Sequence, residues 1–264
     1  MWNFFEYIVV NTVNDSKEIE GFKKNMKKVG IKKYHIRSGK RVSPLNIGDN
    51  NKCESLSAIY NQKESCCGLI CKDLIKRSIE QITKAYNQGC NNILIFEDDA
   101  RFELPINFNK LKFIVNWLQN NKYWEAFYFG YILHPNPLYI LINLKIGRLM
   151  SPNLAHALCI HRRGMKKILQ DVDKNGFPKV QIDKYYNDIL SYKYGPYPAI
   201  NYQIKPPALY SKGIFAVYKK LGISLPKNFT SFNKFVNSLW MLCILIILII
   251  LVILIYLILK YFRK

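Results

Sequence analysis

The sequence predicts an α/β fold with a mostly parallel sheet flanked by helices, followed by one C-terminal transmembrane helix. Two observations support this prediction. Short apolar runs that suit buried strands alternate with longer amphipathic segments along most of the 264 residues. Near the end of the chain, residues 238–259 contain no charged residue, and about 20 apolar residues are enough to cross the core of a bilayer.

The chain opens with a strand–helix–strand unit. Apolar residues at helical spacing predict the helix, with Asp15 as its N-terminal cap and Gly30 as its end. The strands on either side are predicted at 7–10 and 31–36. Residues 38–66 show little periodicity, which is typical of a long loop between this unit and the next.

A second unit is centred on the most apolar strand of the sequence. A helix with apolar residues from Cys71 to Tyr86 precedes the continuous apolar run Ile93–Phe96, which suits a strand covered on both faces. Further elements alternate after it. They are a helix around 111–118, a strand at 126–129, a strand at 155–160 and a helix at 165–172.

The apolar run at 238–259 divides the chain into regions. Trp240 and Tyr256 lie near its two ends, where aromatic side chains favour the level of the lipid headgroups. The domains expected from this division are an α/β domain at 1–225, a juxtamembrane linker at 226–237, the transmembrane helix at 238–259 and a basic tail at 260–264.

The N-terminus carries no basic segment followed by a small-residue cleavage site, so the sequence does not predict a secretory signal. A single span at the C-terminus predicts a tail-anchored protein whose main domain lies in the cytosol. A lipid-anchor signal is the competing interpretation, and the charged residues from Lys260 to Lys264 argue against it.

The charge balance predicts an anionic partner. Lys and Arg number 39 against 18 Asp and Glu, which gives a net charge of +21, and this excess suits lipid, nucleic acid or a nucleotide. We find no recognition-helix, zinc-finger or RNA-binding motif, so nucleic acid is disfavoured. The seven cysteines form no CxxC pair, which disfavours a zinc site and indicates reduced thiols.

Three adjacent carboxylates, Glu97, Asp98 and Asp99, follow the most apolar strand directly. Ligands of open α/β sheets bind beyond the carboxyl ends of the strands. Adjacent carboxylates repel one another unless a cation compensates them, and oxygen ligands suit Mg²⁺ or Mn²⁺ bridging a diphosphate. The alternative is a solvated acidic turn.

The stretch from Ile93 to Ala100 resembles glycosyltransferase family 25, which includes bacterial lipopolysaccharide glycosyltransferases and the collagen galactosyltransferases. Similar segments follow one another in order and cover roughly residues 5–215. They are the opening strand at 7–11, the segment 124–130, the strand–helix passage at 156–165, the triplet 181–183 and the proline-containing turn at 205–207.

This resemblance implies a GT-A fold, which is a Rossmann-like domain that uses a nucleotide sugar, here expected to be a UDP-sugar, and a divalent metal, Mn²⁺ or Mg²⁺. By analogy, Asp99 would coordinate the metal, and Glu97 would contact the ribose or the metal-bound water. Asp183 would be the catalytic base of an inverting transfer, or an ordinary helix N-cap. His156 would be a metal ligand or a sugar contact, or a buried core histidine.

The remaining donor-binding residues are expected to be Asn11, Asp98, Lys17 and Lys72. The two lysines mark departures from the family pattern. Lys17 is the nearest basic residue after the opening strand, where the family usually has an arginine, and Cys71-Lys72 stands where the family has a Ser-His pair. Because Lys cannot reproduce the hydrogen bonding of His or the forked guanidinium of Arg, these departures are compatible with an altered donor preference or a loss of activity.

The sequence thus predicts a membrane-anchored, inverting hexosyltransferase whose acceptor is a glycan, a lipid-linked glycan or a protein. Two alternatives stay open: a catalytically inactive tail-anchored adaptor of the same fold, and a basic membrane-surface protein that binds nucleic acid. The richness in Lys, Asn and Ile is typical of an AT-biased genome. Together with a cytosolic catalytic domain, this composition suits a protein of a large DNA virus. Its membrane would then be a viral or a host intracellular membrane.

Overall fold

The computed structural model describes residues 1–13, 16–39, 66–133, 139–143, 145–153, 155–178, 180–197, 199–203 and 245–260. For residues 66–72, 132–133, 139–141 and 153 it describes the backbone alone. The cap expected at Asp15, most of the loop expected at 38–66 and the whole linker expected at 226–237 lie outside these ranges.

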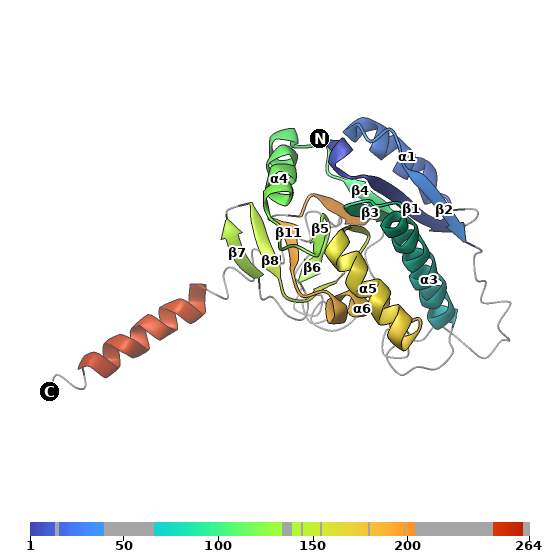
Figure 1. The fold of residues 1–264 in the computed structure, drawn as a ribbon. Helices are drawn as coiled ribbons and strands as arrows, with labels where there is room; N and C mark the ends of the chain where they lie inside the picture. The colour runs from blue at the N-terminus through green and yellow to red at the C-terminus, as the bar shows by residue number, and fades with distance from the viewer. Residues whose placement is uncertain are drawn as a thin grey trace.

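Within these ranges, eight strands form one twisted sheet (Figure 1). In sheet order they are β2 (His35–Gly39), β1 (Tyr7–Val13), β3 (Asn92–Glu97), β10 (Ala157–His161), β5 (Ala126–Tyr128), β11 (Lys193–Pro196), β8 (Ile146–Leu149) and β7 (Tyr139–Asn143). Six of these strands run in one direction, and β10 and β8 run in the other. The expected mostly parallel α/β sheet is confirmed in this sense.

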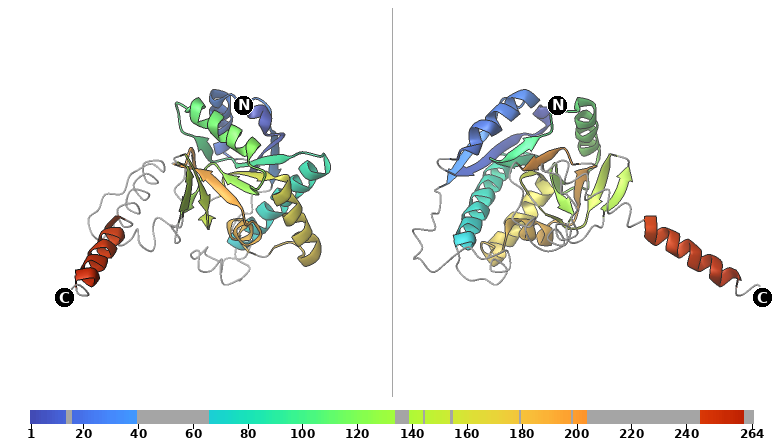
Figure 2. Two further views of the ribbon diagram at one scale, coloured as in Figure 1. Left: turned by 60° about the vertical axis from the view of Figure 1, so that its left-hand side comes forward. Right: turned by 180° about the vertical axis from the view of Figure 1, so that it is seen from behind.

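Helices cover both faces of the sheet (Figures 1 and 2). Helices α1 (Glu18–Val29) and α4 (Phe108–Asn120) pack on one face, and α3 (Cys66–Asn87), α5 (Arg162–Asn175) and α6 (Ile182–Ile189) pack on the other. The position of β3 between the two helical layers explains why its sequence is apolar throughout. Leu94 and Phe96 belong to the core under α1 and α4, whereas Ile93 and Ile95 belong to the core under α3 and α5, because successive side chains of a strand point to opposite faces.

The second strand begins later than the sequence predicts. Helix α1 ends at Gly30 in the left-handed conformation, with φ of 84°, and the Ile31 amide donates to the Met26 carbonyl at 2.9 Å. Ile31 is buried against the same core as α1, as expected for the apolar residue that follows a glycine helix end. Ile31 therefore completes the end of the helix, and β2 starts only at His35.

Short elements complete the domain. A 3₁₀ turn at Trp2–Phe4 precedes β1. Two small antiparallel pairs join β4 (Ala100–Phe102) to β12 (Asn201–Gln203), and β6 (Ile132–Leu133) to β9 (Pro152–Asn153). Strand β4 follows the acidic triplet directly, so the pair β4–β12 forms one border of the candidate site.

One buried side chain takes the place of a neighbouring strand beside β4. The Asn25 amide donates from Nδ2 to the Phe102 carbonyl at 3.1 Å, and the Phe102 amide donates to Asn25 Oδ1 at 2.8 Å. Asn25→Ala leaves both backbone groups without these partners, so we expect the free energy of unfolding to fall by about 3 kcal/mol in urea titrations. The exposed control Asn120→Ala should change it by no more than about 0.5 kcal/mol; equal losses would contradict the role of Asn25.

The apolar segment near the C-terminus forms a helix over 245–260 (red in Figure 1). All of its side chains from Leu245 to Leu259 are exposed. The helix covers part of the segment expected to span a membrane, and residues 238–244 of that segment lie outside the described ranges. In the part of the chain that the structure describes, no helix meets the combined length and apolarity required to cross a membrane.

Candidate active site

Three strands bring the candidate residues to the carboxyl edge of the sheet. In the parallel pair β1–β3, Asn11 lies opposite Glu97, the last residue of β3. Strand β10 runs the other way, so it begins where β3 ends, and the Glu97 amide donates to the His156 carbonyl at 2.9 Å. Ligands of open α/β sheets bind at this edge, and the acidic triplet lies there, as the sequence predicts.

Hydrogen bonds fix the turn that carries the triplet. Thr12 Oγ1 donates to Asp98 Oδ2 at 2.6 Å. The buried Arg101 donates from Nη1 to the Asp98 carbonyl at 2.7 Å and from Nη2 to the Glu18 carbonyl at 2.8 Å. Asp98, expected to bind the donor, therefore contacts β1 and holds the turn in place beside Glu97 and Asp99.

Glu97 lies among other carboxylates. Burial raises its pKa well above the ordinary value, and the negative charges of Asp99, Asp183 and Asp98 raise it further. Gln203, which donates to Glu97 Oε2 at 3.2 Å, opposes this shift. The anionic form of Glu97 is thus disfavoured in the protein alone, and a cation near these side chains would stabilise it.

Asp99 shares this environment. Burial and the neighbouring Asp98 raise the pKa of Asp99 to about 6, although Arg101 acts in the opposite direction. Its Oδ1 atom is buried and accepts no hydrogen bond from the described residues. A buried carboxylate oxygen without a donor is costly, which makes Asp99 the residue of the triplet best suited to bind a cation.

Asp183 reaches the same site from a distant part of the sequence. It lies in the first turn of α6, whose N-cap is Gln181, so Asp183 is not the N-cap residue. Its Oδ1 atom accepts from the Ala155 amide at 2.9 Å. Its charge raises the pKa of Glu97, as well as those of Tyr128 and Tyr186. Asp183 is therefore close enough to the acidic triplet for its charge to act on Glu97.

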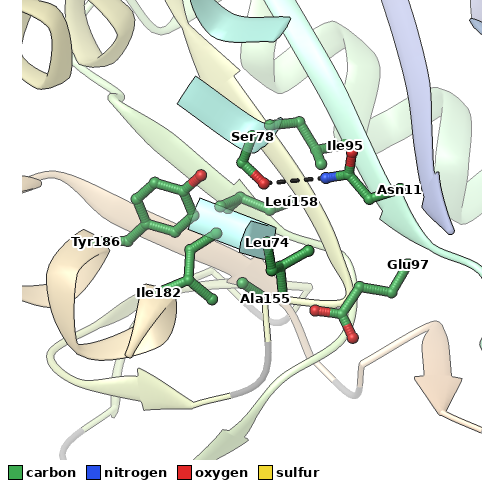
Figure 3. A pocket seen from close by; sticks show the side chains of 9 residues that line it. All are labelled: Asn11, Leu74, Ser78, Ile95, Glu97, Ala155, Leu158, Ile182 and Tyr186. Carbon is green, nitrogen blue, oxygen red and sulfur yellow. Dashed lines mark hydrogen bonds between the residues drawn. The ribbon is translucent and has the colours of Figure 1, made fainter. Parts of the chain in front are cut away.

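A small pocket lies beside Glu97 on the α3 side of the sheet (Figure 3). Its volume is about 10 Å³, enough for roughly one water molecule. It is lined by Asn11, Leu74, Ser78, Ile95, Glu97, Ala155, Leu158, Ile182 and Tyr186. Asn11 Nδ2 donates to Ser78 Oγ at 2.9 Å, whereas the buried Asn11 Oδ1 has no hydrogen-bond partner among the described residues.

The sequence prediction missed Ser78 and Tyr186. Ser78 lies within the apolar face of α3, between Ile75 and Ile82, and all three side chains are buried. A polar residue at helical spacing inside an apolar face was the available signal, because it must face either the core or a site. Tyr186 follows Asp183 by one helical turn, which is a weaker signal.

The backbone of His156 borders the site, but its side chain contacts Gly130 and the backbone of β12. Its side chain is fully buried, and burial lowers its pKa to about 3, opposed by a hydrogen bond with the Asn201 backbone. Its ring packs against Gly130. This surrounding favours the buried core histidine, the alternative that the sequence left open, over a role beside Asp99.

Of the two lysines expected to bind the donor, the structure describes the side chain of Lys17 alone. Lys17 is exposed at the N-cap position of α1, at the carboxyl edge of β1. Lys72 belongs to α3, and its side chain lies outside the described set. Neither is brought into a contact with the acidic triplet that the structure describes.

The close packing of Gly130 leads to a stability prediction. A Cβ atom at this position would collide with the His156 ring and lie 2.5 Å from the Asn201 carbonyl oxygen. We expect Gly130→Ala to lower the free energy of unfolding by about 3 kcal/mol, measured by chemical denaturation. The control Gly89→Ala meets no atom within 4 Å but has φ of 81°, so it should cost only about 1 kcal/mol. An equal loss in both variants would show that Gly130 is not tightly packed.

The acidic side chains suit a metal that binds together with a phosphate group. No cluster of three or more His, Cys, Asp and Glu side chains that could hold a metal ion occurs among the described residues. Mg²⁺ sites often need only one or two carboxylates, since phosphate oxygens and water complete the coordination shell. Asp99, with its unpaired buried oxygen, and its neighbour Glu97 meet this smaller requirement.

No protein-family model matches the sequence, and no curated protein matches it. Among solved structures, A197 from STIV is similar with a TM-score of 0.35 and 14% identity, covering 72% of this chain and 81% of that chain. A glycosyltransferase involved in the glycosylation of the major capsid of PBCV-1 is similar with a TM-score of 0.28 and 14% identity, covering 64% of this chain and 68% of that chain. Both scores are too low to support a function, so membership of glycosyltransferase family 25 stays a prediction.

Proposed function

We propose that the protein is a metal-assisted glycosyltransferase that transfers a hexose from a nucleotide sugar, a UDP-sugar, to a glycan, lipid-linked or protein acceptor. The observation that supports this most is the geometry at the carboxyl edge of the sheet. Glu97 ends β3 and Asp99 follows it, and Asp183 accepts from the Ala155 amide, next to His156, whose carbonyl accepts from the Glu97 amide. Burial and mutual repulsion raise the pKa values of Glu97 and Asp99, which is the electrostatic condition that a cation relieves.

Each residue has a proposed role in this site. Asp99 would bind the divalent cation, Mn²⁺ or Mg²⁺, together with the diphosphate of the donor. Glu97 would accept a hydrogen bond from the ribose or from a water on the metal. Asn11, whose Oδ1 atom lacks a hydrogen-bond donor among the described residues, would contact the nucleoside, and Lys17 and Lys72 would contact phosphate as point charges.

The transfer itself requires a base. When bound, the cation would neutralise the charge that develops on the departing diphosphate. Asp183 would accept the proton of the acceptor hydroxyl as its oxygen bonds to the anomeric carbon and the bond from that carbon to the diphosphate oxygen breaks, which inverts the configuration. The Ala155 amide, 2.9 Å from Asp183 Oδ1, orients this carboxylate.

The proposed anchor is the apolar C-terminal segment. A helix that is apolar on every face requires an apolar environment, and the side chains of 245–259 are all exposed in the isolated chain. We propose that this segment holds the enzyme at a membrane with its catalytic domain in the cytosol.

Donor binding tests the proposal. Full-length protein in detergent is titrated calorimetrically with UDP-, GDP- and CMP-sugars, with Mn²⁺, with Mg²⁺ and with EDTA. We expect binding of a UDP-sugar that requires the metal. Absence of binding to every donor would overturn the proposal in favour of a catalytically inactive adaptor of the same fold, which the small volume of the pocket beside Glu97 also suits.

A further inference from the structure

A surface far from the acidic triplet carries a dense positive charge. It consists of the exposed lysines on the last two turns of α1 and on the connection to β2, which we call the lysine surface: Lys24, Lys27, Lys28, Lys32 and Lys33. The opposite face of α1 is buried in the core through Phe22, Met26 and Val29. The packing of α1 against the sheet therefore fixes the orientation of the lysines toward solvent.

Nearby acidic residues do not neutralise this surface. Glu20 binds Lys23 at 2.7 Å, and Glu18 pairs with Arg101 at 3.9 Å. Within the described part of the chain, none of the five lysines of the lysine surface forms an ion pair. The five charges are thus available to an external anion.

A groove of about 740 Å³ adjoins the lysine surface. Lys32, Lys33 and His35 contribute to one side of it, and Trp2 and Tyr34 add aromatic surface. Glu6 also lines the groove, but its two carboxylate oxygens accept from the amide and the side chain of Asn91, both at 2.8 Å. The groove therefore combines unpaired cations with aromatic rings, and its carboxylate is already bound.

We propose that the lysine surface and this groove bind the anionic headgroups of a phospholipid membrane. Clusters of four to eight basic residues on an amphipathic helix, such as α1, are a charge pattern that recognises anionic lipid. The helix over 245–260 exposes apolar side chains from Leu245 to Leu259, which suits a bilayer and has no use in binding nucleic acid. Electrostatic and apolar contacts act additively on membrane affinity.

The arrangement of the fold also suits this orientation. Helix α1 returns from the carboxyl edge of β1 to the start of β2, so the connection that carries Lys32 and Lys33 lies at the amino edge of the sheet. The acidic triplet lies at the carboxyl edge. A membrane bound at the amino edge would leave the candidate active site facing the solvent and its acceptor.

Vesicle flotation of the full-length protein tests the proposal. Vesicles of phosphatidylcholine alone report the contribution of the apolar helix, and vesicles that also contain phosphatidylserine report the added contribution of charge. The test variant carries Gln at all five positions of the lysine surface. The matched control carries the same five-charge loss on exposed lysines away from the amino edge of the sheet, by Lys→Gln at Lys76, Lys112, Lys145, Lys174 and Lys184.

We expect the test variant to bind phosphatidylserine vesicles about tenfold more weakly or worse, with unchanged binding to phosphatidylcholine, whereas the matched control keeps most of its affinity. Salt should reduce the wild-type affinity for anionic vesicles to that of the test variant. Equal losses in the two variants would show that only net charge matters and would overturn the proposal. RNA binding of the same variants is measured in parallel. If the test variant keeps its vesicle binding but binds RNA more weakly, the surface recognises nucleic acid and the proposal is overturned.

Discussion

Asp99→Asn strongly weakens metal-dependent binding of the nucleotide sugar. The substitution keeps the size of the side chain but removes the charge that we assign to the cation, and Asp99 Oδ1 has no hydrogen bond within the described residues to lose. We expect the dissociation constant of the donor in the presence of Mn²⁺ to rise at least about 100-fold, since loss of a residue that only supports a metal ligand already costs up to about that much. Isothermal titration calorimetry of the full chain measures it.

The control for Asp99→Asn is Asp173→Asn, an exposed aspartate on α5, which should leave the donor affinity unchanged. The variant should also remain folded, since the raised pKa of Asp99 shows that its charge is unfavourable in the metal-free protein. A variant that binds the donor with Mn²⁺ as tightly as the wild type would show that Asp99 does not hold the cation.

Asp183→Asn separates catalysis from binding. The amide can still accept from the Ala155 backbone through its oxygen, so the local structure should persist. An amide cannot take the proton of the acceptor hydroxyl, and loss of a general base lowers the turnover number by about 10² to 10⁴. We expect this fall in the transfer rate with an unchanged affinity for the donor, measured by product formation and by calorimetry.

Asp188→Asn provides the matched control for this second prediction. Asp188 is exposed on the same short helix, α6, and its substitution should change neither the rate nor the affinity. The contrary result is an Asp183→Asn variant that keeps a normal turnover number but has a raised KM for the acceptor. Asp183 would then bind the acceptor, and another residue would be the base.

The central part of the fold could be predicted from the sequence because its signals are local. The run Ile93–Phe96 is apolar since both faces of β3 are covered, and Gly30 ends α1 where the sequence predicts. The short strands β4, β6, β9 and β12 were not predicted. Segments of two or three residues contain too few positions for periodicity to be recognised.

The site was predictable only in part, for a physical reason. Glu97 and Asp99 are neighbours in sequence and follow a buried strand, so their place at the edge of the sheet follows from the chain itself. Asp183 and Gln203 reach Glu97 from distant segments, and no local pattern reports such an encounter. His156 shows the same limit, because the family resemblance left a metal ligand and a core histidine open, and its contacts with Gly130 and Asn201 are tertiary.

The most direct measurement is a crystal structure of the full chain with UDP and Mn²⁺. We expect Mn²⁺ within about 2.2 Å of a carboxylate oxygen of Asp99, the diphosphate on the metal at the carboxyl edge of β1 and β3, and Asp183 across the site from the leaving group. A nucleotide bound elsewhere, for instance in the groove beside Lys32 and Lys33, with Asp99 still bare, would contradict this expectation.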